Sequence, residues 1–293
     1  MREMRRFSGF GTSIAVALLS GCSFSSDGSQ GPRPGFQVVD GSAVYLGPVG
    51  PGVAAPTITR YVDADSSTFR SVNGPGEGKA PFYEHLEYGK DSEKVFIAFS
   101  AFVYQLESCD AATFTVISAD GKYAKDKDRV FYCGLPLKGS DAKSFRLLDP
   151  PYAVDAKQAY AGNRVLLNAN PKALEVVKPG GTSPPLTPES GRLVPSDSTA
   201  APTQMWGWAR DGQYYYNGSL RIDGAEYGAF KILNTLYGKD SSSVFYVGSE
   251  GGSVTGETIV RRVDGADAMS FQVTGPNSGE DIHGQYERGR RKR

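Results

Sequence analysis

The sequence predicts an all-β protein made of tandem repeats of about 30 residues, with about three strands in each repeat. The first observation is a ten-residue phrase that recurs as YGKDSEKVFI (88–97), YAKDKDRVFY (123–132) and YGKDSSSVFY (237–246). The second is the composition of the 293-residue chain, whose 36 Gly, 18 Pro, 16 Tyr and 15 Phe suit many turns between aromatic strands. The third is the unbroken apolar run that ends each phrase, which is typical of a strand covered on both faces.

Each repeat is expected to begin with a short strand that reads Tyr-x-x-Asp. The polar residues after this strand fit a tight hairpin turn, most clearly at Asp211-Gly212. The Val-Phe-Tyr run forms the second strand and is followed by a turn that contains Gly or Pro. A segment such as DAKSF (141–145) then predicts a single capped helical turn, in which the Asp side chain accepts amide hydrogens. Its Phe enters the core before a third strand.

About six such units are expected. Three copies are clear, two fainter ones occupy 152–174 and 208–230, and a worn first copy begins near GSAVYLG (41–47). A unit of this size cannot bury its aromatic faces alone and must stack on its neighbours. The pattern leaves open whether the stack closes into a propeller-like ring or forms an open, solenoid-like array.

These phrases also carry a family resemblance. YAKDKDRVFY followed by DAKSF, together with its echoes, resembles the DKNYY repeat family of bacterial envelope and lipoprotein sequences, over most of residues 40–275. The chain departs from the family motif at Asp128-Arg129, where Asn or His is expected, and the fourth copy has Ala159 in place of Val. The family has no established activity, so the resemblance implies an architecture and no catalysis.

The N-terminus has the layout of a secretory signal. Three arginines stand among the first six residues, and a short apolar stretch follows at 12–19, too short for a permanent membrane span. The next residues, LSGC (19–22), resemble a bacterial lipobox. This resemblance implies cleavage before Cys22 and lipid on its thiol and new amino group. The alternative is an ordinary signal peptide cut nearby, with Cys22 incidental.

The mature protein is therefore expected to be held at a membrane by acyl chains. The Ser/Gly/Pro-rich residues after Cys22 have the composition of a flexible tether. Ser23 follows the modified cysteine, and by resemblance to Gram-negative lipoproteins the absence of Asp there is compatible with sorting to an outer membrane. The expected location is the bacterial cell envelope.

Two further cysteines, Cys109 and Cys133, remain for the folded part. Outside the cytosol they can form a disulfide across a separation of 24 residues. Two buried free thiols are the alternative, and the sequence leaves both open.

Residues suited to catalysis or metal binding are sparse. The two histidines, His85 and His283, are not accompanied by a serine in a G-x-S-x-G elbow or by an H-E-x-x-H motif. Carboxylate pairs occur in DAD (63–65) and DKD (126–128), and such pairs can hold Ca²⁺ or hydrolyse glycans. Neither pair completes a known calcium-loop spacing, and Asp126 is explained by its turn. No metal or cofactor is predicted, and a net charge of zero provides no attraction for nucleic acid.

The segment MWGWARDGQYYYNG (205–218) contains both tryptophans and three tyrosines. Trp208 takes the position of the first Tyr in the repeat and is expected in the core. Trp206 alone lies outside the pattern, which makes it the candidate for stacking on a sugar ring or a peptide.

The sequence predicts a lipid-anchored envelope protein that presents a β-repeat surface to an unidentified envelope protein or glycan, without enzymatic activity. The alternative is an envelope hydrolase whose carboxylates come from turns of different repeats.

The segment rich in Pro and Ser is expected to be a loop within a continuous array, with a linker between four and two units as the alternative. The basic tail is expected to be solvated, or to touch anionic lipid or polymer. The expected division is a signal peptide (1–21), a tether (22–37), repeats 1–4 (38–177), the Pro/Ser-rich segment (178–204), repeats 5–6 (205–275) and a disordered basic tail (276–293).

Overall fold

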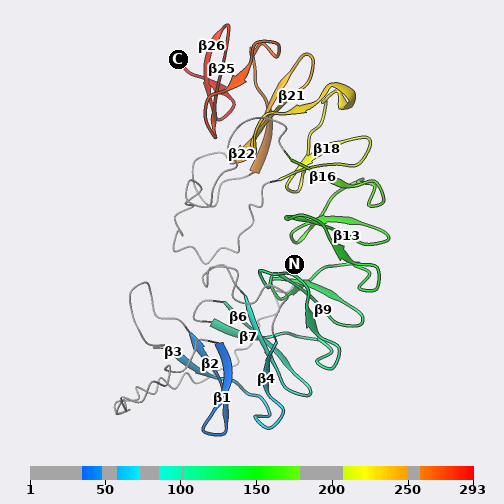
Figure 1. Cartoon of the computed structure of the whole chain (residues 1–293), viewed down its shortest axis with the longest axis vertical. Coiled ribbons are helices and arrows are strands. Elements are labelled where there is room, and N and C mark those ends of the chain that lie inside the picture. Colours follow the sequence, from blue (N-terminus) through cyan, green and yellow to red (C-terminus); the bar gives the residue numbers. More distant parts are fainter. Residues whose placement is uncertain (1–34, 48–57, 73–85, 100–101, 179–206, 250–257) are drawn as a thin grey trace, which may run out of the picture.

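Seven small antiparallel sheets, stacked one after another, form an open curved array (Figure 1). The computed structural model describes residues 35–47, 58–72, 86–99, 102–178, 207–249 and 258–293. Sheet 1 and sheet 7 lie at opposite ends of the array (Figure 1), so the open arrangement, and not the closed ring, is the one adopted. The prediction of an all-β chain of stacked repeats is confirmed. Helical structure within these ranges is limited to the 3-10 turn η2 (Tyr227–Ala229).

The first four sheets follow the chain in order, and each strand pairs with the next. Sheet 1 contains β1 (Gly35–Val39), β2 (Ser42–Gly47) and β3 (Ile58–Tyr61). Sheet 2 contains β4 (Arg70–Val72), β5 (Glu87–Lys90), β6 (Val95–Phe99) and β7 (Phe102–Gln105). Sheet 3 contains β8 (Thr115–Val116), β9 (Tyr123–Lys125), β10 (Val130–Tyr132) and β11 (Leu135–Pro136). Sheet 4 contains β12 (Arg146–Leu147), β13 (Tyr152–Val154), β14 (Ala159–Ala161) and β15 (Arg164–Val165).

The last three sheets repeat the four-stranded order of sheets 2 to 4. Sheet 5 contains β16 (Glu175–Val177), β17 (Trp208–Arg210), β18 (Tyr215–Asn217) and β19 (Leu220–Arg221). Sheet 6 contains β20 (Lys231–Ile232), β21 (Tyr237–Lys239), β22 (Val244–Ser249) and β23 (Thr258–Arg262). Sheet 7 contains β24 (Gln272–Val273), β25 (Ser278–Asp281), β26 (Gly284–Glu287) and β27 (Arg290–Arg291).

Six of the seven sheets have four strands, one more than the sequence predicted for each repeat. The missed strand follows the Val-Phe-Tyr run and is often only two residues long, as in β11. Two residues are too few to show the alternation of apolar and polar side chains that marks a strand, and Pro136 suggested a turn there. Proline is tolerated because β11 is an edge strand, where a ladder donor is not needed on the outer side.

The prediction of a disordered tail at 276–293 is wrong. Strands β25, β26 and β27 form most of a seventh sheet in this segment. Its repeat pattern was hidden because Ser278 takes the position of the usual Tyr. The Ser278 hydroxyl donates a hydrogen bond of 2.7 Å to Glu287 on the next strand.

The predicted tether at 22–37 also ends too late, because β1 begins at Gly35. Phe36 is buried, and its ring lies 4.9 Å from that of Tyr45 and 5.9 Å from that of Phe69. An aromatic side chain with this burial belongs to the core of sheet 1 and not to a flexible segment.

The core consists of layers of rings between successive sheets. In most layers, the Phe that ends the capped turn contacts one ring of the preceding sheet and one of the following sheet. Phe114 lies 5.3 Å from Tyr88 and 6.2 Å from Phe131, measured between ring centroids. Phe271 likewise lies 5.5 Å from Tyr237 and 5.7 Å from Tyr286. Each such ring joins two sheets; the sequence had predicted that this Phe enters the core. Leu174 has the corresponding place between sheets 4 and 5.

A small residue two positions before the turn aspartate makes room for this ring. A Cβ atom added at Gly238 would lie 2.4 Å from Phe230, and one added at Gly279 would lie 2.3 Å from Phe271. Sheets 3, 4 and 5 have alanine at the same position. The repeat therefore reads Tyr-(Gly or Ala)-x-Asp in sheets 2 to 4 and 6, for a steric reason.

A polar contact also joins each of sheets 2 to 6 to the sheet that follows it. The side chain of the aromatic residue at the start of the phrase donates a hydrogen bond to a backbone carbonyl of the next sheet or of the turn beside it. For example, the Tyr152 hydroxyl lies 2.7 Å from the carbonyl oxygen of Gly207. The full set is Tyr88 to Gly121, Tyr123 to Gly162, Tyr152 to Gly207, Trp208 to Asn234 and Tyr237 to Asn277.

The Pro/Ser-rich segment connects two strands of the same sheet. β16 precedes it, β17 follows it, and the two pair from Glu175↔Arg210 to Val177↔Trp208. Residues 179–206 themselves lie outside the described part of the chain. Because both flanking strands belong to sheet 5, the segment does not separate four units from two.

Candidate functional site

Six aspartates in equivalent turns hold the array together. In each turn, one carboxylate oxygen accepts the backbone N–H groups two and three residues later. The other oxygen accepts a backbone N–H from the connection to the preceding sheet, at 2.6–3.0 Å. We call these residues the clamp aspartates: Asp91, Asp126, Asp155, Asp211, Asp240 and Asp281.

Asp240 shows the arrangement in full. One of its carboxylate oxygens accepts the N–H groups of Ser242 at 2.9 Å and Ser243 at 2.8 Å. The other accepts the N–H of Glu226 at 2.9 Å. The side of the array that carries these turns is called here the aspartate-turn side.

In five of the six clamp aspartates, these hydrogen bonds favour the charged carboxylate. Burial alone would raise the pKa of Asp240, but the N–H donors of Glu226, Ser242 and Ser243 outweigh it, so the pKa is lowered. The same balance lowers the pKa of Asp91, Asp155, Asp211 and Asp281. A general acid in glycan hydrolysis needs the opposite shift. These five clamp aspartates are therefore suited to accepting hydrogen bonds from the backbone and not to donating protons.

Lysines before some clamp aspartates hold the connection on the other side. The Lys90 ammonium group is buried and donates to the carbonyl oxygen of Ala111 at 2.6 Å, in the turn that leads to sheet 3. Lys125 and Lys239 make corresponding bonds to Ala142 and Phe271. The Lys-Asp dipeptide thus joins one sheet to both neighbouring connections.

The carboxylate pairs singled out from the sequence are divided between structural contacts. Asp63 forms an ion pair of 2.9 Å with Lys94, whereas Asp65 accepts hydrogen bonds from Ser67 and Thr68 in its own turn. In the second pair, Asp126 is a clamp aspartate. Within the described ranges, no group of three or more potential ligands is placed to hold a metal ion.

Of the two histidines, His85 lies outside the described residues. His283 is exposed in the turn between β25 and β26, where its backbone N–H donates to Asp281. Asp281 is a clamp aspartate, so its proximity to His283 in the sequence reflects the turn.

Cys109 and Cys133 are free thiols. Both are partly buried against the core between sheets 2 and 3. Burial raises the pKa of Cys109 to about 12 and that of Cys133 to about 11. Thiols with such high pKa values are poor nucleophiles at neutral pH, because the thiolate is the reactive form. The structure thus has two free thiols and no disulfide between Cys109 and Cys133.

Cys22 and Trp206 both lie outside the described residues. Trp208 is 2 % exposed, as its place in the repeat predicted. Exposed aromatic rings occur instead on β7, where Phe102 and Tyr104 stack with centroids 6.4 Å apart. No repeat position distinguished them in the sequence, because β7 itself was not predicted.

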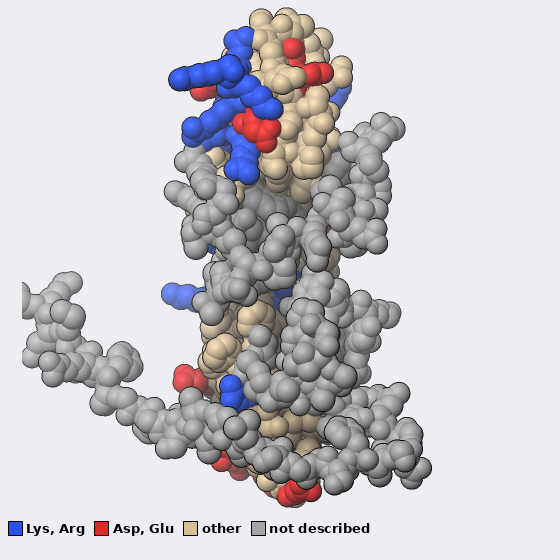
Figure 2. Space-filling view, turned by 90° about the vertical axis from the view of Figure 1, so that its left-hand side faces the viewer, with Lys and Arg blue, Asp and Glu red and all other residues tan. Residues whose placement is uncertain are grey.

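The last strands of the successive sheets form the second notable surface, which we call the fourth-strand side. It consists of β3, β7, β11, β15, β19, β23 and β27, each at the edge of its sheet. Near sheet 2 it presents the aromatic pair Phe102 and Tyr104. Towards sheet 7 it becomes basic, and Figure 2 shows Lys and Arg gathered at this end. The basic residues of the last described stretch are Arg261, Arg262, Arg288, Arg290, Arg291, Lys292 and Arg293.

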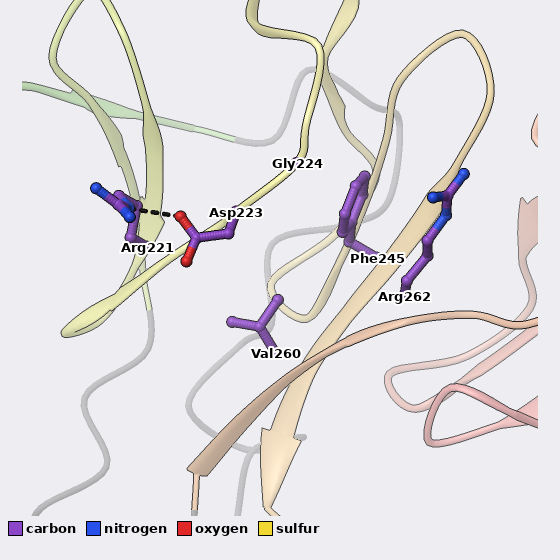
Figure 3. Close-up of a pocket in the computed structure, with 6 residues that line it drawn as sticks. All are labelled: Arg221, Asp223, Gly224, Phe245, Val260 and Arg262. Atoms are coloured by element: carbon purple, nitrogen blue, oxygen red, sulfur yellow. Dashed lines mark hydrogen bonds and ion pairs between the residues drawn. The ribbon is translucent and has the colours of Figure 1, made fainter.

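A hollow of about 230 Å³ opens on the fourth-strand side between sheets 5 and 6 (Figure 3). Arg221 of β19 and Arg262 of β23 lie on its two sides, and Phe245 and Val260 supply apolar walls. Arg221 donates to Asp223 at 2.6 Å. A hollow of about 390 Å³ occupies the opposite end of the same gap, next to Arg210 and Lys231.

A sequence model of the DKNYY family matches residues 35–135 and 123–282. The chain belongs to the DKNYY family. The resemblance noted in the sequence is thereby confirmed over most of the described array. No curated protein and no solved structure matches the chain significantly.

Among the described residues of this DKNYY chain, no helix is both long enough and apolar enough to cross a membrane.

Proposed function

We propose that this chain is a lipid-anchored protein of the bacterial cell envelope whose repeat array serves as a rigid binding surface. The anchor rests on the N-terminal pattern: a basic start, a short apolar stretch and LSGC at 19–22. Acyl chains on Cys22 would fix the protein to the membrane, since each buried CH₂ contributes about 0.8 kcal/mol.

The binding role is supported by one observation, which is that the turn carboxylates accept hydrogen bonds from the backbone. All six clamp aspartates accept backbone N–H groups from two segments of the chain. A glycan hydrolase built from turns of different repeats would need carboxylates of this kind for chemistry. Here the same groups stabilise the stack, which favours an array that presents surfaces over one that catalyses.

The anchor is tested with Cys22→Ser in the native host, with metabolic labelling by an alkyne fatty acid and membrane fractionation. We expect the substitution to abolish labelling and to release the protein from membranes. Cys109→Ser provides the matched control, because it removes a thiol of the folded array and should change neither result. Unchanged labelling of the Cys22→Ser protein would contradict the proposal.

The choice between binder and hydrolase is tested by single Asp→Asn substitutions at the clamp positions. We expect each substitution to reduce the folded fraction, and the amount of protein retained in the envelope, only as far as it lowers the free energy of unfolding. A variant that remains folded but loses glycan turnover measurable in the wild type would support the hydrolase.

A further inference from the structure

Three arginines occupy the same register position in three consecutive sheets. In β19, Arg221 stands opposite Tyr216, in β23 Arg262 stands opposite Phe245, and in β27 Arg291 stands opposite Tyr286. Each of these partners comes five residues after a clamp aspartate, so the positions are structurally equivalent. Sheets 2, 3 and 4 have Gln105, Pro136 and Val165 there. We call Arg221, Arg262 and Arg291 the arginine row.

The register also fixes the direction of these side chains. Residues directly opposite each other in an antiparallel pair lie on the same face of the sheet. Phe245 belongs to the core between sheets 5 and 6, and Tyr286 to the core between sheets 6 and 7. Each arginine of the row therefore lies at the rim of the gap before its own sheet. Stacked sheets are about 10 Å apart, so the row extends over about 20 Å.

The row lies in a basic part of the surface. Arg262 forms no ion pair with any carboxylate in the described part of the chain, and it borders the hollow in Figure 3. The Arg221 guanidinium is paired with Asp223 and also lies 4.4 Å above the ring of Tyr214. Arg291 donates to the carbonyl oxygen of His283. Arg288, in the turn between β26 and β27, and Arg293, after β27, are exposed nearby.

We propose that the arginine row binds a linear polymer that carries phosphate groups, such as a phosphate-bearing polymer of the envelope. Guanidinium groups pair with phosphate through two parallel hydrogen bonds, and an exposed arginine retains donors for this purpose. One such contact is weak, but three contacts along one chain reinforce one another. A row about 20 Å long therefore selects an extended polyanion over a single phosphate.

The position of the row favours a polymer over the phosphates of a bilayer. This step rests on the proposed function, in which the lipid is attached before sheet 1. The row begins at sheet 5 and ends at sheet 7, and sheets 1 and 7 lie at opposite ends of the array (Figure 1). The row thus lies towards the end of the array that is opposite sheet 1, and the proposed anchor precedes sheet 1.

The test uses the full chain with Cys22→Ser, fluorescent long-chain polyphosphate and fluorescence anisotropy. We expect long chains to bind at least about tenfold more tightly than triphosphate, which can reach only one arginine of the row. The variant R221Q/R262Q/R291Q should bind long chains at least about tenfold more weakly. The control R70Q/R146Q/K231Q removes three exposed charges from first strands and should bind within about twofold of the parent chain.

Equal weakening in the two triple variants, or equal affinity for long chains and triphosphate, would overturn the proposal. Pelleting with phosphatidylglycerol vesicles in the absence of any polyphosphate binding would overturn it in favour of a bilayer. The chain-length comparison leaves the row intact, so it decides the question even where a variant fails to fold. Because binding is measured in vitro, its failure leaves the test of lipid attachment at Cys22 unaffected.

Discussion

The two sides of the array differ in how their side chains are used. On the aspartate-turn side, six carboxylates repeat the same three backbone contacts in six sheets. On the fourth-strand side, equivalent positions change from Gln105 and Pro136 to Arg221, Arg262 and Arg291. Repetition of identical contacts indicates a structural task. Variation at a fixed register leaves room for binding.

This difference predicts that acid destabilises the fold through the aspartate-turn side. The pKa values of five clamp aspartates are lowered in the folded chain. Protonation therefore favours the unfolded state, whose aspartates have the ordinary pKa of about 3.9. We expect the free energy of unfolding to be constant above about pH 5 and to fall steadily as the pH drops below about 4. Urea denaturation across this range measures it.

The acid effect is expected to be the largest, because several clamps are lost together. Asp240→Asn cannot accept all three N–H groups, so its stability should be lower at neutral pH and depend less on acid. A variant with the same pH dependence as the wild type would show that the clamp does not titrate in this way.

A single clamp can be compared directly with a carboxylate on the other side. Asp240→Ala leaves three backbone N–H groups without their acceptor and should lower the free energy of unfolding by about 3 kcal/mol. Asp223→Ala removes an exposed partner of Arg221 and should cost less than about 1 kcal/mol. Chemical denaturation of both variants measures the two losses in the free energy of unfolding. Similar losses would remove the distinction between the two sides.

The hydroxyl contacts between sheets should contribute less than a clamp. The Tyr237 hydroxyl donates to Asn277 at 2.9 Å and accepts from the N–H of Gly289 at 3.0 Å. Tyr237→Phe keeps the ring in the core and should lower the free energy of unfolding by about 1–2 kcal/mol. A neutral result in equilibrium denaturation would mean that the Tyr237 hydroxyl contributes nothing measurable to the joining of sheets 6 and 7.

The smallest effect is expected for the exposed aromatic pair. The exposed fractions of Phe102 and Tyr104 are 52 % and 59 %. Tyr104→Ala should change the free energy of unfolding by less than about 1 kcal/mol, as is usual for surface positions. A larger loss, measured by the same denaturation, would show that β7 belongs to the structural part of the molecule.

The sequence carried the parts of the fold that depend on local chemistry. The turns at five of the six clamp aspartates, the buried Val-Phe-Tyr strand and the burial of the following Phe could all be predicted from ten to twenty neighbouring residues. The second contact of each clamp was not predicted, because it depends on how successive sheets stack; its donor lies between 14 and 41 residues before the aspartate. Neither were two-residue strands such as β11, which have too few side chains to show alternation.

The site was less predictable than the fold. The arginine row depends on a register that pairs Arg221 with Tyr216 and Arg291 with Tyr286, and both arginines lie on strands that the sequence did not predict. Sheet 7 was overlooked because Ser278 takes the place of an aromatic residue. A search for the clamp aspartate and the small residue two positions before it, as in Gly279 and Asp281, would have found this sheet.

We infer that the clamp aspartates couple successive sheets into one stable array. Native-state hydrogen exchange at the clamped backbone amides, with Glu226 as the reference, tests it most directly. We expect the Glu226 amide to exchange only with global unfolding in the wild type and at least about tenfold faster in Asp240→Ala. Exchange in the wild type as fast as that of exposed turn amides such as Gly224 would contradict it.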